Sequence, residues 1–107
     1  MTDPHLHAFA AKERVERMRW FILRALDICR PEGAYVPYVH DAVRGIYRDA
    51  TELEVKREID YLVDRGLVRL TVDTTDHWFV ELNRYGVDVV TYAVPVEPGI
   101  ARPKFGS

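Results

Sequence analysis

Asp49–Leu70, DATELEVKREIDYLVDRGLVRL, is the stretch that decides the fold. Thr51-Glu52-Leu53-Glu54 has the T-x-x-E spacing of a capping box, in which the Thr51 hydroxyl accepts from the Glu54 N–H and the Glu54 carboxylate accepts from the Thr51 N–H. Apolar residues then recur at helical spacing and predict one buried face: Val55, Ile59, Leu62 and Val63. The helix is predicted to stop at Gly66, because glycine can take the left-handed conformation of a helix C-cap.

The residues after this helix predict a β-hairpin. Leu67–Val72 has strand alternation, and one face is formed by Val68, Leu70 and Val72. Asp73–Asp76 is a polar turn cluster. A second strand follows, in which Trp78, Val80 and Leu82 alternate with Phe79, Glu81 and Asn83.

This stretch resembles the recognition helix and first wing strand of winged helix-turn-helix domains. The resemblance lies in a capped helix, the pattern Ile-x-x-Leu-x-x-x-Gly-Leu-Val at its end, and a strand directly after it. The resemblance implies an α+β fold with a three-helix core, a two-stranded wing, a short fourth helix and an extended C-terminal tail. Glu81–Asp88 also looks like the strand-to-helix exit of several bacterial winged-helix families, with Asn83 where threonine is usual. Asn83 is therefore expected to cap a fourth helix from Arg84 to about Thr91.

Two further helices are predicted upstream. Lys12–Cys29 reads as the first long helix, with a stripe made of Val15, Met18, Ile22, Ala25, Leu26 and Cys29. It should end near Arg30, since Pro31 disfavours helix in the residue before it. Pro37 to about Tyr47 is expected to form a short second helix, with Val39, Val43 and Ile46 aligned and Ala42 beside them. The Arg48–Ala50 turn joins it to the third helix in a helix-turn-helix.

The chain of 107 residues is long enough for one core. We expect a flexible N-terminus at 1–11, a winged-helix domain at 12–92 and an extended, Pro-rich tail at 93–107, draped on the domain through Val94, Val96 and Ile100. The last quarter of the chain resembles the end of small uncharacterised proteins encoded in Mu-like prophages. The resemblance lies in Gly86-Val-Asp-Val-Val and in the later Val-Glu-Pro-Gly-Ile-Ala-Arg-Pro-Lys. That resemblance implies a phage context and assigns no activity.

Composition argues against several classes of protein. Cys29 is the sole cysteine, which excludes an internal disulfide and a cysteine metal cluster, and His5-x-His7 has no third ligand nearby. Neither a membrane-length apolar run nor a signal-peptide pattern is present, so we expect a cytoplasmic protein. His40 and Asp41 diverge as helix neighbours, and Gly66 and Gly86 are isolated, so a non-enzymatic protein without metal or cofactor is expected.

The outward face of the third helix is the candidate site. Leu53, Arg57 and Tyr61 follow one another at four-residue steps on the side opposite the core. In a DNA-binding winged helix this face enters the major groove, where Arg57 would reach guanine and Leu53 a thymine methyl. The expected nucleic-acid-binding residues, phosphate contacts included, are Thr51, Leu53, Lys56, Arg57, Tyr61, Arg44, Arg48, Thr74, Thr75 and His77.

Charge keeps a second interpretation open. The formal net charge is −2, whereas phosphate contacts supply most nucleic-acid affinity. The third helix and the wing tip carry many carboxylates, which favours a winged-helix module that binds a protein partner and no DNA. Trp20 and Leu23 fall off the main stripe of the first helix, so either another element covers them or they form a weak homodimer face.

Overall fold

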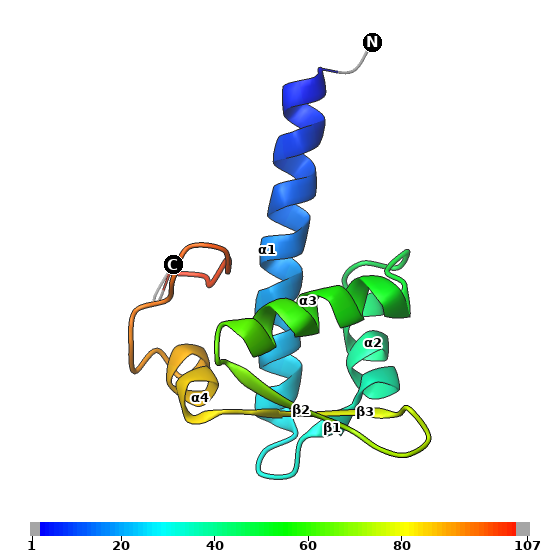
Figure 1. Cartoon of the computed structure of the whole chain (residues 1–107). Helices are drawn as coiled ribbons and strands as arrows, with labels where there is room; N and C mark the ends of the chain where they lie inside the picture. The colour runs from blue at the N-terminus through cyan, green and yellow to red at the C-terminus, as the bar shows by residue number, and fades with distance from the viewer. Residues whose placement is uncertain (1–2, 105–107) are drawn as a thin grey trace.

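The computed structural model describes residues 3–104 and has the α+β architecture predicted from the sequence (Figure 1). Its elements in chain order are α1 (Pro4–Ile28), β1 (Ala34–Tyr35), α2 (Val36–Arg44), α3 (Glu52–Asp64), β2 (Val68–Val72), β3 (Trp78–Leu82) and α4 (Arg84–Val90). The three longer helices pack together, and the small sheet closes one end of them.

α1 begins eight residues earlier than the sequence pattern predicted. Asp3 caps it by accepting from the His5 N–H at 2.9 Å, and Pro4 occupies the first helical position, which suits a residue without an N–H. Residues 4–11 are therefore helical, although the sequence pattern indicated no regular structure there; residues 1 and 2 lie outside the described part. Periodicity missed this segment because a helix already nucleated by packing extends without an apolar face of its own.

The core lies between α1, α2 and α3, and it includes both residues that seemed to fall off the α1 stripe. Leu23 is fully buried, and Trp20 is 6% exposed, with its ring edge-to-face against Tyr92 at 6.0 Å. The predicted homodimer face of Trp20 and Leu23 is wrong, because α4 and the tail cover that side of α1. Ile46, expected in the core, is 48% exposed because α2 ends at Arg44.

The sheet has three strands, in the order β1-β3-β2, and the sequence predicted two. β2 and β3 form the expected antiparallel hairpin, with Val68 opposite Leu82 and Val72 opposite Trp78. β1 adds Ala34 opposite Val80 on the other side of β3. A two-residue strand is too short to show alternation, so no local pattern indicated it.

The segment after α4 lies against the helices rather than away from them. The Ala101 N–H donates to the Glu16 carbonyl of α1 at 3.0 Å. The Arg102 guanidinium donates to the carbonyls of Val89 and Val94 at 3.0 and 2.8 Å, and Ile100 is buried. Residues 105–107 of the predicted tail lie outside the described residues.

Candidate nucleic-acid interface

The N-terminal end of α3 is held by the predicted Thr51 cap and by a contact between Glu54 and α1. The Thr51 hydroxyl accepts from the Glu54 N–H at 3.1 Å. The Glu54 carboxylate accepts two bonds, at 2.8 and 3.0 Å, from the Arg14 guanidinium of α1, and a weaker contact with the Thr51 backbone also favours its ionised form. These bonds lower the pKa of Glu54 and raise that of Arg14, so the pair stays charged. Arg14 also contacts Asp49 at 3.0 Å, which anchors the α2–α3 turn to α1.

Tyr61 is partly covered, although it was expected on the outward face of α3. The Arg19 guanidinium lies 3.5 Å from the centroid of the Tyr61 ring. Its Nε donates to Glu58 at 2.7 Å and its Nη1 to the Gly99 carbonyl at 2.8 Å. Gly99 lies so close to the tyrosine that an added Cβ would stand 2.2 Å from the Tyr61 hydroxyl. The tail and Arg19 thus cover part of the Tyr61 side chain, which leaves it less exposed than Leu53 and Arg57.

The first two turns of α3 keep the predicted exposed face. Leu53 is 60% exposed. Arg57 is exposed, and its side chain forms no ion pair or hydrogen bond with any residue from 3 to 104. Lys56 is half-buried, with its Nζ 5.0 Å from the centroid of the Trp78 ring and 3.5 Å from Glu52. Arg57 is therefore the cation of this face best placed to meet a ligand.

The second half of the same helix is acidic. Asp60 and Asp64 are exposed on the turns that follow Arg57. Successive residues at three- and four-residue steps share a helix face, so these carboxylates continue the line of Leu53 and Arg57. A polyanion would therefore meet favourable charge at the N-terminal half of α3 and repulsion at the C-terminal half.

Arg44 and Arg48 lie beside the α2–α3 turn, where they line an open groove of about 510 Å³ with Asp41 and Gly45. Arg44 Nη1 is 4.0 Å from Asp41, and both side chains are largely exposed. Arg48 is exposed and has no side-chain partner within the described range. The two guanidinium groups can thus turn toward an anion without breaking a short ion pair.

The wing tip is organised by Asp73. Its Oδ1 accepts from the Thr75 hydroxyl at 2.6 Å, the Thr75 N–H at 2.8 Å and the His77 N–H at 3.0 Å. These three hydrogen bonds lower the pKa of Asp73 to about 2, and the bond from the Thr75 hydroxyl has the largest effect. The Thr75 hydroxyl also lies 2.8 Å from His77 Nδ1, so it is hydrogen-bonded within the turn. Of the two threonines in the described wing tip, Thr74 is therefore the one whose hydroxyl can bind a ligand. Asp73 and Asp76 make the tip acidic.

Some residues that position the site had no local signal. Arg14, Arg19 and Glu58 join α1 to α3 across 39 or 40 residues of sequence, a separation that no spacing rule covers. Asn83 occupies the N-cap position of α4, as predicted, yet its side chain makes no capping bond. Its amide instead donates to the Gly66 carbonyl at 3.3 Å and links the end of α3 to the end of β3.

Other kinds of site find no support in residues 3–104. No three His, Cys, Asp or Glu side chains of that range come together as a metal site. None of the helices found there is long and apolar enough to cross a bilayer. Cys29 packs partly against the core, and His40 contacts the Ala50 carbonyl at 2.7 Å, so both side chains have structural positions.

Solved structures with this arrangement are winged helix-turn-helix proteins, and the chain has that fold. A protein of Ralstonia eutropha JMP134 for which DNA binding has been suggested superposes with a TM-score of 0.61 at 15% identity, over 73% of this chain and 95% of that chain. MepR, the transcription regulator of the Staphylococcus aureus efflux pump MepA, gives 0.60 at 15% identity over 86% and 73%. The MepR–DNA complex gives 0.61 at 18% identity over 81% and 73%. No protein-family model and no curated protein sequence matches the chain.

Proposed function

We propose that the chain is a non-enzymatic regulatory protein that binds duplex DNA through the first two turns of α3. The observation that carries the proposal is Arg57, which lies exposed at the middle of the outward face and has no ion pair or hydrogen bond among residues 3–104. Leu53 extends that face toward the helix start, and Arg48 lies exposed in the turn before it. MepR has a similar fold and was solved in complex with DNA, and this likeness supports DNA binding by the present chain.

Each residue has a role that follows from its chemistry. A guanidinium matches the N7 and O6 acceptors of guanine, so Arg57 reads a base edge, and the Leu53 side chain contacts a thymine methyl. Arg44 and Arg48 bind phosphates beside the groove. The Thr51 hydroxyl accepts from the Glu54 N–H and can still donate its own proton to a phosphate. Lys56 contributes less, because Glu52 and Trp78 already engage it.

The acidic wing limits this interface. Asp73 and Asp76 repel phosphates, so the wing contributes at most Thr74 and His77 at its edge, and Thr75 stays within the turn. With Arg44 and Arg48 as the main phosphate contacts, about two counterions would be released, and log K should fall with log salt at a slope of about −2. This is a weak electrostatic contribution, so sequence-specific contacts of α3 must carry much of the affinity.

A second candidate function rests on the same acidity. Asp60 and Asp64 continue the face that carries the exposed Leu53, and the wing tip is also acidic, which fits a basic protein partner. In that case Leu53 and Arg57 are the anchors of a protein interface and DNA is not bound. A cytoplasmic location and a prophage origin fit both candidates; the origin rests on the resemblance of the tail alone.

Fluorescence anisotropy with duplex DNA separates the two candidates. A preferred duplex is first selected from a random pool, and binding of that duplex and of a scrambled one is then measured across a salt series. Arg57→Ala should lower the preference by about 1–3 kcal/mol, the value of one bidentate base contact. Arg48→Ala should weaken both duplexes equally, as loss of a phosphate contact does. Arg84→Ala removes an exposed arginine from α4, on another part of the domain, and is the control.

Three results would count against DNA binding as proposed. If the wild type binds no duplex at low salt, the protein-partner function is favoured, and Leu53→Ala and Arg57→Ala should both weaken that complex. Equal binding of the selected duplex by wild type and Arg57→Ala would remove the reading role of this arginine. A loss of binding in Arg84→Ala as large as in Arg48→Ala would show that contacts are not confined to the α2–α3 side.

A further inference from the structure

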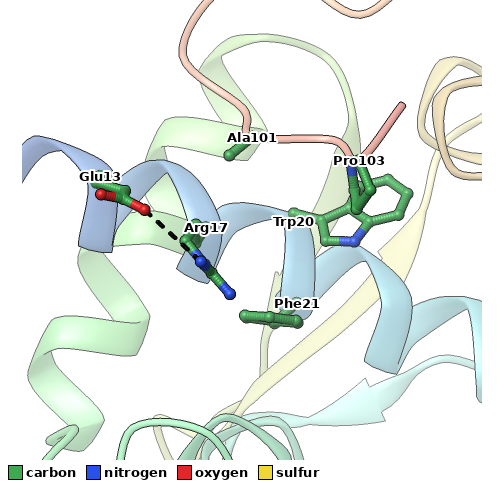
Figure 2. Close-up of a pocket in the computed structure, with 6 residues that line it drawn as sticks. All are labelled: Glu13, Arg17, Trp20, Phe21, Ala101 and Pro103. Atoms are coloured by element: carbon green, nitrogen blue, oxygen red, sulfur yellow. Dashed lines mark ion pairs between the residues drawn. The ribbon is translucent and has the colours of Figure 1, made fainter. Parts of the chain in front are cut away.

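The chain holds one of its own prolines with a pair of aromatic side chains. Figure 2 shows Pro103 of the tail beside the Trp20 ring, in a groove between α1 and the tail. The Tyr92 ring lies edge-to-face against Trp20, and its hydroxyl donates to the Pro103 carbonyl at 2.6 Å. Proline has no N–H, so its ring and its carbonyl are the groups that a protein can recognise. Trp20 and Tyr92 contact both groups.

A similar set of aromatic side chains lies open at the base of the wing. The groove there has a volume of about 280 Å³ and is lined by Tyr35, Pro37 and His77. The Tyr35 ring stands edge-to-face against Phe79, with 5.0 Å between the centroids, and against His77 at 6.4 Å. Tyr35 is 51% exposed, and its hydroxyl has no hydrogen-bond partner among residues 3–104. The wing-base groove thus offers an outside ligand the two features that hold Pro103 within the chain, an aromatic ring and a tyrosine hydroxyl.

The wing-base groove lies where the sheet narrows from three strands to two. β1 ends at Tyr35, opposite Phe79, and the chain then enters α2. β3 extends one residue further, to Trp78, which pairs with β2 on one side and with no described strand on the other. A groove of this size beside an unpaired length of strand admits a few residues of an extended peptide. It is too small for a helix, whose diameter with side chains is about 10–12 Å.

The carboxylates around this groove select the charge of its ligand. Asp41 lies four positions after Pro37, hence on the same side of α2, and its exposed carboxylate is 4.0 Å from Arg44. Asp73 and Asp76 belong to the wing tip and shortly precede the histidine of the groove. These charges repel phosphates and attract Lys or Arg side chains. They therefore favour a basic peptide over a nucleic acid as the ligand.

We propose that the wing-base groove binds a basic, proline-rich peptide of a partner protein. A proline ring of the peptide lies on Tyr35, the Tyr35 hydroxyl donates to a peptide carbonyl, and a neighbouring Lys or Arg pairs with Asp41 or Asp76. Proline-rich segments are already extended in the polyproline II conformation, and their carbonyls have no internal hydrogen bonds. Such a ligand loses little conformational freedom on binding, so a small groove is sufficient. The proposal does not depend on DNA binding by α3.

Fluorescence anisotropy of the full chain with a labelled peptide of Pro-Pro-Arg repeats tests the proposal. The wild type should bind this peptide saturably. A peptide of Gly-Gly-Arg repeats has the same charge without the proline rings, and a peptide of Pro-Pro-Glu repeats has the rings with the opposite charge. Both should bind more weakly, because the proposed site requires the rings and the positive charge together.

Variants of two tyrosines with matching exposure locate the site. Tyr35→Ala should raise the dissociation constant of the Pro-Pro-Arg peptide by about tenfold or more, since the main ring and the hydroxyl are both lost. Tyr38→Ala is the matched control, because Tyr38 is 50% exposed and does not line the groove. The double variant Asp41→Asn, Asp76→Asn leaves the sheet intact and should also weaken binding. It therefore tests the site even if Tyr35→Ala proves to be unfolded by circular dichroism.

Four results would overturn the proposal. They are no saturable binding by the wild type, equal binding of the Gly-Gly-Arg peptide, equal losses in Tyr35→Ala and Tyr38→Ala, and unchanged binding in the double variant. Binding of a single-stranded oligothymidine in place of the peptide, with the same dependence on Tyr35, would instead assign the groove to base stacking. Arg57→Ala should bind the peptide as the wild type does, so failure of this proposal and failure of DNA binding are distinguishable.

Discussion

Arg19 and Glu58 form a buried ion pair, with 2.7 Å between Nε and Oε1, that joins the middle of α1 to the middle of α3. Both side chains are largely shielded from water, and the same guanidinium covers the Tyr61 ring and bonds to the Gly99 carbonyl. One arginine thus connects α1, α3 and the tail. This contact, together with the Arg14–Glu54 pair and the buried stripe of α3, holds the outward face of α3 in place.

Glu58→Ala should destabilise the fold by roughly 3–5 kcal/mol, because removal of one partner leaves the buried Arg19 charge uncompensated. Urea denaturation followed by circular dichroism measures the change. The double variant Arg19→Met, Glu58→Leu should cost less than the single one, since no buried charge remains. A double variant less stable than Glu58→Ala would show that the pair, rather than its charge balance, supplies the stability.

Leu62→Ala should lower the free energy of unfolding by roughly 2–5 kcal/mol, since Leu62 is fully buried and its loss leaves a cavity. Leu53→Ala, on the opposite face of the same helix, should change stability by no more than about 0.5 kcal/mol. Denaturant titrations of the two variants compare them directly. Similar costs at both positions would contradict the orientation of α3 described above.

Thr51→Ala should cost about 1 kcal/mol through loss of the bond from the Glu54 N–H at the start of α3. Thr51→Ser keeps the hydroxyl and should retain most of the stability. Thermal melts under identical conditions give the comparison. The cap hypothesis fails if the serine and alanine variants unfold at the same temperature.

Asp73 should titrate at about pH 2 in the folded protein, below its ordinary value of 3.8. A lowered pKa means that the ionised carboxylate stabilises the folded wing. This contribution to stability is complete when the pH is above the pKa of the aspartate in the unfolded chain, and it disappears as the pH falls from about 4 toward 2. Thr75→Val removes the main donor and should raise the pKa. NMR titration of the carboxyl carbons measures both proteins; an unchanged midpoint in Thr75→Val would assign the shift to another cause.

Local patterns predicted α3 and the hairpin well because their determinants lie within a few residues. Thr51 caps α3, and Val55, Ile59 and Leu62 are buried, as the helical period required. The same period placed Leu53 and Arg57 outside. Sequence patterns did not predict the start of α1 or the strand β1, because neither segment has an apolar repeat long enough to detect.

The amino-acid sequence by itself determined the order of the four helices and the two hairpin strands, the cap and buried stripe of α3, and the exposure of Leu53 and Arg57, because short-range hydrogen bonds and side-chain periodicity specify them. Only the tertiary structure decided that Arg19 and Gly99 cover part of Tyr61, that Asn83 bonds to Gly66 in place of capping, and that Trp20 is enclosed. These outcomes depend on segments 17 to 80 residues apart in sequence. Packing brings such segments together, and charge and shape then select the partners.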